Sequence, residues 1–166
     1  MTPPPVSLTA PALTDWTPLR GLRAHESTSV IGRGEETWSR ASAEVPRWSV
    51  KTRSGFRMAP AAEAVIGARP TITVYLLGIA VVEPVEVVDV VTAAHRVGFA
   101  YRTRPGHPLD GEEAFIVHRA GPEVRLTIRS LTRPAPAGFW RPMYPALLLA
   151  QQVVRRRYRA ALREPE

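Results

Sequence analysis

Residues 98–113 of the chain read GFAYRTRPGHPLDGEE. A strand-like run leads into this stretch, two proline-containing dipeptides at 105–108 interrupt it, and a second strand-like run follows from Gly111. Because binding and catalytic groups are often carried on loops that rigid elements hold in place, this turn is the first place to look for a functional site. Its ionisable and polar side chains are Tyr101, Arg102, Arg104, His107, Asp110, Glu112 and Glu113.

The chain has 166 residues and no cysteine. This length suits one domain with a substantial core, and the lack of cysteine excludes disulfides, thiolate zinc sites and cysteine nucleophiles. The proline-rich, uncharged start does not resemble a signal peptide. We therefore predict a disordered lead over residues 1–14 and a single domain over residues 15–166. The longest apolar run, Ile72–Val82, is about half of the roughly 20 residues that cross a bilayer, so we expect a cytoplasmic protein that does not enter a membrane.

The net charge of +7 suggests a nucleic-acid hypothesis. Of the 22 basic residues only Lys51 is a lysine, and the arginines are spread along the chain apart from the run Arg155–Arg157. Such arginine enrichment also follows from a GC-rich genome, and no helix-turn-helix, zinc finger or aromatic RNA-binding motif accompanies it. We expect a solvated, arginine-rich surface, and binding to nucleic acid or to an acidic partner is an alternative.

Short helix and strand signals occupy the first part of the chain. Glu35–Glu44 is predicted to be a helix, because apolar residues recur there at helical spacing and a proline follows. Arg47–Thr52 is predicted to be a half-buried strand, since Trp48 and Val50 alternate with polar residues. Residues 55–68 have room for one further short strand. Beyond them, β-branched residues recur in strand-like runs whose short links favour an antiparallel meander: 71–82, 85–92, 97–103, 113–118 and 124–131.

The hydrophobic period changes to that of a helix after Pro145. At 1.5 Å per residue, a helix over residues 146–163 would be about 27 Å long, which suits a helix laid across a sheet. The predicted class is α+β, with a short N-terminal helix, a curved antiparallel sheet and a long C-terminal helix packed across that sheet. One face of the long helix carries Leu147, Gln151, Val154, Tyr158 and Leu162.

Several segments together resemble one known family. They are Gly98-Phe99-Ala100-Tyr101, Gly106-His107-Pro108, Gly111-Glu112-Glu113-Ala114-Phe115, Ile31-Gly32-Arg33-Gly34, Arg133-Pro134, Gln151 and Arg157-Tyr158. The pattern is similar to that of the bacterial and plant family catalogued as domain of unknown function nineteen-ninety, over roughly residues 24–162.

The resemblance implies a helix-grip fold of the START and birch-pollen-allergen type. In that fold an antiparallel sheet wraps a long C-terminal helix around an internal cavity. The family has no established activity, so the resemblance assigns no catalytic residue. Arg102 stands where the family usually has a glycine, and the loop of this chain therefore need not share the family's shape.

Strand geometry separates the two carboxylates at the end of the 98–113 stretch. Neighbouring residues of a strand point to opposite faces, so Glu112 and Glu113 cannot both face a cavity. Glu113 shares its face with apolar residues and is the one expected inside, where a carboxylate needs a partner. Tyr101, Arg102 and Arg104 on the preceding strand are the candidate partners. Such a pair would either bind a ligand or only hold the hairpin in register.

The remaining candidates each have a structural alternative. His107 could serve as general base or metal ligand, but with no partner defined by the sequence it is more simply a brace for its loop. Gln151 lies in the apolar stripe of the terminal helix, where its amide must be hydrogen-bonded by the core or by a ligand. Trp140 and Tyr144 could line the mouth of a cavity. Metal binding is not expected, because adjacent polar groups in a turn are usually solvated, and no cofactor is implied.

The familiar catalytic motifs, such as Gly-x-Ser-x-Gly and His-Glu-x-x-His, are absent from the chain. The leading hypothesis is a protein that binds a small, largely apolar ligand in a cavity between the sheet and the terminal helix. An alternative is an enzyme that uses the same pocket, with His107 or Glu113 as acid or base. The candidate ligand-binding residues are Tyr101, Arg102, His107, Glu113, Trp140, Tyr144 and Gln151.

Overall fold

The computed structural model describes residues 6–164. Its strands are β1 (Arg23–Arg33), β2 (Arg57–Ala59), β3 (Thr71–Leu76), β4 (Ile79–Ala93), β5 (Arg96–Thr103), β6 (Leu109–Ala120) and β7 (Glu123–Pro134). Its helices are α1 (Gly34–Glu44), the 3-10 helix η1 (Val45–Arg47), α2 (Ser49–Thr52) and α3 (Tyr144–Ala161).

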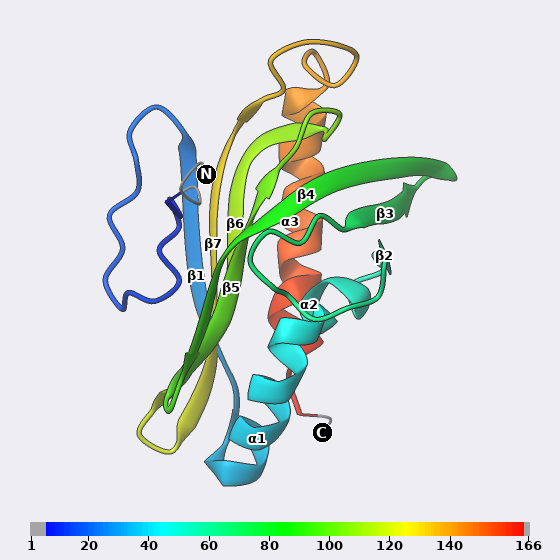
Figure 1. Ribbon diagram of the computed structural model, residues 1–166. Helices are drawn as coiled ribbons and strands as arrows, with labels where there is room; N and C mark the ends of the chain where they lie inside the picture. Colours follow the sequence, from blue (N-terminus) through cyan, green and yellow to red (C-terminus); the bar gives the residue numbers. More distant parts are fainter. Residues whose placement is uncertain (1–5, 165–166) are drawn as a thin grey trace.

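Within the described residues, seven strands form one antiparallel sheet in the order β1-β7-β6-β5-β4-β3-β2. The sheet curves around α3, which runs along its inner side; α1 lies at one end of the sheet, and α2 lies nearer its middle (Figure 1). This arrangement confirms the predicted α+β class, with a short N-terminal helix, an antiparallel sheet and a long C-terminal helix.

The strand predictions need correction at three places. Residues 71–82, predicted as one run, form β3 and the start of β4, because Leu77 and Gly78 turn the chain with φ values of 50° and 79°. β4 then continues through the run predicted for residues 85–92. The sequence did not predict β1, which is rich in serine and charged residues and is held in the sheet by pairing with β7.

The strand predicted for residues 47–52 is wrong. Most of this segment forms the short helix α2, and Trp48 before it has a φ of 63°, which turns the chain. Trp48 and Val50 are buried, as the alternation suggested, but Lys51, which follows Val50, is buried as well. A segment this short does not distinguish a two-residue period from a helical one.

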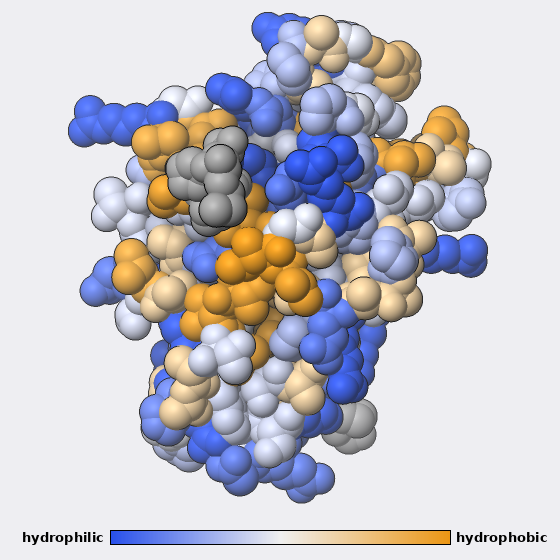
Figure 2. Space-filling view, in the orientation of Figure 1, coloured by the Kyte–Doolittle hydropathy of each residue, from blue (hydrophilic) through white to orange (hydrophobic). Residues whose placement is uncertain are grey.

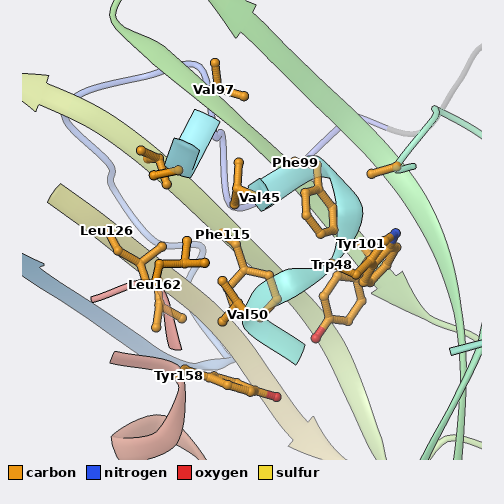
Figure 3. Packing of buried hydrophobic residues seen from close by; sticks show 14 of the residues in the cluster. Val45, Trp48, Val50, Val97, Phe99, Tyr101, Phe115, Leu126, Tyr158 and Leu162 are labelled. Carbon is orange, nitrogen blue, oxygen red and sulfur yellow. The ribbon is translucent and has the colours of Figure 1, made fainter. Parts of the chain in front are cut away.

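The main hydrophobic core lies between the inner face of the sheet and the helices. Trp48 packs against two aromatic rings of β5, with ring centroids 4.5 Å from Phe99 and 5.2 Å from Tyr101 (Figure 3). Phe115 of β6 meets Tyr158 of α3 edge to face at 5.2 Å. These contacts fix α2 and α3 over the strands that carry the candidate residues.

The first described residues pack against the outer face of the sheet. Arg129 of β7 is 1 % exposed and donates to four backbone carbonyls between Thr9 and Thr14. Glu112 of β6 accepts hydrogen bonds from the amides of Leu8 and Thr9. The described part of the predicted disordered lead is therefore held in place by polar contacts, which corrects that prediction. Its first five residues lie outside the described residues.

Candidate functional site

A pocket of about 90 Å³ lies between the inner face of the sheet and α3. Its apolar lining comes from the loop after α2, from β3 and β4, and from α3: Phe56, Val74, Leu76, Val81, Leu147, Ala150 and Val154. Its polar lining comes from α2, the sheet and α3, and includes Lys51, Glu83, Tyr101, His107, Glu113, Ser130, Thr132, Gln151, Arg155 and Tyr158.

The structure brings four of the seven predicted site residues together at this pocket. Of the others, Arg102 points to the outer face of the sheet, because it follows an inward residue, and donates to Glu112 at 3.0 Å. Trp140 packs at the margin of the core. Tyr144 begins α3 outside the lining of the pocket. The four residues that line the pocket are Tyr101, His107, Glu113 and Gln151.

Glu113 faces the pocket from β6, as the alternation predicted, and its partner is Tyr101. The two residues are paired across β5 and β6, and the Tyr101 hydroxyl donates to Glu113 Oε1. Burial, and then the charge of Glu113, raises the pKa of Tyr101 well above its ordinary value. The hydroxyl is therefore a fixed donor, since its ionisation would place a second negative charge beside the carboxylate.

Lys51 is a pocket residue that the sequence prediction missed. Its Nζ lies 3.3 Å from Glu83 Oε2 and 3.8 Å from Glu113 Oε1, and its side chain is 5 % exposed. The same nitrogen lies 4.2 Å from the centre of the Phe56 ring, in a cation–π contact. A buried ammonium needs partners of this kind, and here one cation lies between two carboxylates.

A signal for Lys51 was present in the composition. Every other basic residue of the chain is an arginine. Lysine carries a compact charge with three donors on a flexible stem, whereas arginine carries a planar fork. A lone lysine in an arginine-rich chain therefore marks a position where the smaller group fits. The predicted strand concealed this signal, because it placed Lys51 on the solvent side.

His107 is buried at the pocket and braces its own loop. Its Nδ1 accepts a hydrogen bond from the Leu109 amide at 2.9 Å, so the neutral ring carries its proton on Nε2. Burial lowers the pKa of His107 to about 4, against the opposing charge of Glu83, whose Oε2 lies 3.9 Å from Nε2. Near neutral pH this side chain is a hydrogen-bond donor toward the pocket, and its accepting nitrogen is already used.

The part of the pocket nearest β7 is lined by Arg155 and Gln151 of α3 and by two hydroxyl residues of the strand. Arg155 donates to Ser130 Oγ at 3.1 Å and to Gln151 Oε1 at 3.5 Å. Among the described residues Arg155 forms no ion pair. The amide oxygen of Gln151, predicted to need a partner, is thus paired within the protein.

Glu112 lies on the opposite face of β6 and belongs to the contact with the N-terminal residues. Its carboxylate accepts hydrogen bonds from the Ser7 hydroxyl at 2.6 Å and from the Thr9 hydroxyl at 2.7 Å. Burial opposes ionisation, but the bonds from Ser7, Thr9 and the backbone outweigh it and lower the pKa of Glu112.

In residues 6–164 no group of three or more histidine, aspartate or glutamate side chains is placed to hold a metal ion.

A curved antiparallel sheet wrapped around a long C-terminal helix is a helix-grip fold, and several solved structures share it with this chain. The Zhui aromatase/cyclase from Streptomyces sp. R1128 matches with a TM-score of 0.55, 14% identity and coverage of 85% of this chain and 92% of its own. A START superfamily protein from Mycobacterium smegmatis matches with a TM-score of 0.50, 14% identity and coverage of 84% and 95%. Ara h 8.0201 matches with a TM-score of 0.52, 9% identity and coverage of 86% and 98%. At these identities the likeness establishes the fold alone.

The family is established by a more specific match. Residues 3–161 match the family model described as Domain of unknown function (DUF1990), and the chain belongs to this family. The resemblance in residues 98–113 is thereby confirmed. No curated protein matches the chain.

Of the helices in the described part of the chain, none is long and apolar enough to cross a membrane.

Proposed function

We propose that this protein binds a small, largely apolar molecule in the pocket between the sheet and α3. The observation that carries the proposal is the lining, whose exposed surface is mostly apolar while polar groups from different elements point into the same space. Small-molecule sites commonly combine these two features. Helix-grip neighbours such as the Streptomyces aromatase/cyclase support the proposal, because their shared fold places a sheet around a long helix in the same way.

The polar groups of the pocket would orient the ligand by donating to it. The Nε2–H of His107 can donate because Nδ1 is occupied, and the amide nitrogen of Gln151 can donate because only its oxygen is bonded to Arg155. Tyr101 contributes its ring to the wall, since its hydroxyl is bonded to Glu113. A ligand with one or two acceptor atoms on an apolar body fits this set of donors.

Filling the pocket tests the proposal. Ala150 of α3 lines the pocket, whereas Ala160 of the same helix is exposed. Ala150→Leu places extra volume where the ligand would lie, and Ala160→Leu is the matched control with the same change in helix propensity. A metabolite screen by thermal shift identifies ligands of the wild type, since a molecule that binds only the folded state raises its stability. We expect Ala150→Leu to abolish these shifts and Ala160→Leu to retain them. Shifts that survive in Ala150→Leu would rule out this pocket.

A second candidate function is an enzyme that uses the same pocket. The observation that favours it is the buried set of Lys51, Glu83 and Glu113, because buried charges are costly and often occur at reactive sites. Glu113 would be the acid or base, since the accepting nitrogen of His107 is already bonded. Incorporation of solvent deuterium into a bound ligand, followed by NMR, tests this function. Incorporation that Glu113→Gln leaves unchanged would exclude Glu113 from that role.

A further inference from the structure

Three arginines converge on the inner face of the sheet where β1 and α3 meet. Burial, and then the charges of Arg155, Arg159 and Arg23, holds the pKa of His25 below its ordinary value, so all three act on the same ring. Among the described residues none of the three forms an ion pair. Positive charge is therefore gathered here without contact to a carboxylate of residues 6–164.

Glu113 is the carboxylate whose charge acts most strongly on Arg155. Burial lowers the pKa of Arg155, and the charge of Glu113 opposes that shift without cancelling it. Glu113 Oε1 accepts from the Tyr101 hydroxyl and lies 3.8 Å from Lys51 Nζ. Its charge is therefore already shared with the Lys51 ammonium.

Buried polar atoms without partners lie at the same place. Within the described residues, His25 Nε2 and Thr132 Oγ1 are inaccessible and have no hydrogen-bond partner. Arg23 faces Thr132 and His25 faces Ser130 in the register of β1 and β7, so the four side chains share the inner face. Thr132 is 7% exposed and lines the pocket. Buried hydroxyls are normally bonded, and an unpaired one beside uncompensated guanidinium groups suits a ligand rich in acceptors.

We propose that the ligand is an anionic amphiphile, with an apolar body and one oxyanion head group that Arg155 binds. Ser130 and Thr132 supply hydroxyls for the same head group, and Arg23 and Arg159 supply its electrostatic support. The guanidinium fork matches the geometry of a carboxylate or a phosphate. Arg155 and Thr132 line the same pocket as the apolar residues of β3, β4 and α3, so head and body occupy one continuous space. This inference rests on the proposed function and adds the chemical class of the ligand.

Lys51 does not bind the anionic head group, and a cationic head group does not fit the pocket. The ammonium of Lys51 already lies between Glu83 and Glu113, so it offers no free charge to an anion. A cationic head group would have to displace Lys51 from these carboxylates and leave a buried ammonium without its partners. Within the part of the chain that the structure describes, Arg155 is the pocket cation that forms no ion pair.

Probes that share one body and differ in head group test the inference. The binding of hexanoate, 1-hexanol, hexylammonium and hexyl phosphate is measured by calorimetry on the full chain at constant ionic strength. We expect hexanoate or hexyl phosphate to bind at least about tenfold more tightly than hexanol, the size of effect that a charged hydrogen bond gives. Whichever of the two anions binds more tightly assigns the head group as a carboxylate or a phosphate. We expect hexylammonium to bind most weakly.

Variants of α3 separate the head-group site from general charge. Arg155→Gln should remove the preference for the anions over hexanol, and Arg156→Gln, at an exposed neighbouring position of the same helix, should retain it. Arg159→Gln is a second variant that leaves the Arg155–Ser130 contact in place, and should weaken anion binding to a smaller extent. Circular dichroism and thermal unfolding establish that each variant folds.

Two outcomes separate failure of the inference from failure of the proposed function. Equal affinities for hexanoate, hexyl phosphate and hexanol, all lost in Ala150→Leu, would overturn the anionic head group and leave the ligand pocket standing. Anion binding that Ala150→Leu leaves unchanged would show that the anion binds outside the pocket. This result would overturn the inference, because the head group and the apolar body would then not share one site. Equal losses in Arg155→Gln and Arg156→Gln would overturn the role of Arg155.

Discussion

Lys51 lies between two carboxylates inside the pocket, so its removal leaves Glu83 and Glu113 without their shared cation. We expect Lys51→Met to lower the free energy of unfolding by about 3 to 5 kcal/mol, the usual cost of breaking a buried ion pair. Urea unfolding followed by tryptophan fluorescence measures the change, since Trp48 packs in the neighbouring core. The loss should be smaller when Glu113→Gln is already present, because one of the uncompensated charges is then absent.

The control for Lys51 is an exposed ion pair of the same chain. Arg47 and Glu63 lie 3.3 Å apart with side chains that are 64% and 61% exposed. Arg47→Met should therefore change the free energy of unfolding by less than about 1 kcal/mol. A loss in Lys51→Met no larger than the loss in Arg47→Met would contradict the assignment of Lys51 to a buried, structurally required ion set.

His107 makes the stability of the protein depend on pH. Its pKa is about 4 in the folded protein and about 6.5 in the unfolded chain. Between these values the unfolded chain binds a proton that the folded protein does not. Stability therefore rises as the pH rises from about 4 to about 6.5 and is level above that range. Over this window His107 contributes a change of about 3 kcal/mol.

Comparison of variants isolates the contribution of His107 from that of other groups. Burial lowers the pKa of His118 to about 4 as well, so it adds a change of the same sign that remains in every variant. His107→Gln should reduce the rise in stability between pH 4 and 6.5 and leave the part that His118 contributes, as measured by urea unfolding at a series of pH values. His95→Gln, at an exposed position in the turn between β4 and β5, is the matched control. Parallel curves for wild type and His107→Gln would contradict the buried, neutral imidazole.

At the scale of elements, the hairpin of β3 and β4 carries an unfavourable turn residue. Leu77 is fully exposed at the tip of this projecting hairpin (Figure 1) and has a φ of 50°, followed by Gly78 at 79°. Asparagine followed by glycine is the preferred pair for a two-residue turn of this conformation. Leu77→Asn should therefore raise the free energy of unfolding by about 1 kcal/mol, and the midpoint of thermal unfolding by roughly 2–4 °C.

Ile79 is the control for the turn. It is exposed beside the same turn but lies in β4, where the backbone is extended. Ile79→Asn removes similar apolar surface from water and gives no relief of backbone strain, and asparagine is unfavourable in a strand. We expect no gain for Ile79→Asn, and equal gains in the two variants would show that exposure and not the turn limits stability.

The elements that could be predicted from the sequence are those with a sustained period. The terminal helix keeps one period for 18 residues, and the alternation in β6 is long enough to place Glu113 inside and Glu112 outside. Lys51 was missed because α2 spans a single turn, too short for any period to appear. The burial of Glu112 was missed because it depends on the Leu8 amide, 104 residues away in the chain. The pattern of neighbouring residues does not indicate contacts between residues that are far apart in the chain.

At the scale of the whole molecule, much of the positive charge is neutralised by ion pairs between arginines and nearby carboxylates. The chain has 22 basic and 15 acidic residues. Ten arginines form ion pairs with carboxylates within the described part of the chain. Hydrophilic residues are distributed around the visible face and are interrupted by hydrophobic patches (Figure 2). The converging arginines of β1 and α3 serve an internal site in our proposal.

This distribution predicts weak binding to nucleic acid. A 20-base-pair duplex should bind with a Kd no tighter than about 10⁻⁶ M at physiological salt, within the non-specific range for a basic protein. Fluorescence anisotropy between 50 and 200 mM salt measures both the affinity and its salt dependence. Arg156 and Arg157 are exposed on α3 and are the residues through which an electrostatic contact would be made. Tighter binding that is lost steeply with salt, and lost again in Arg156→Gln with Arg157→Gln, would contradict this prediction. Such a result would assign the basic helix to a nucleic-acid partner, because arginines that neutralise phosphates release the counterions of the duplex and make binding depend on salt.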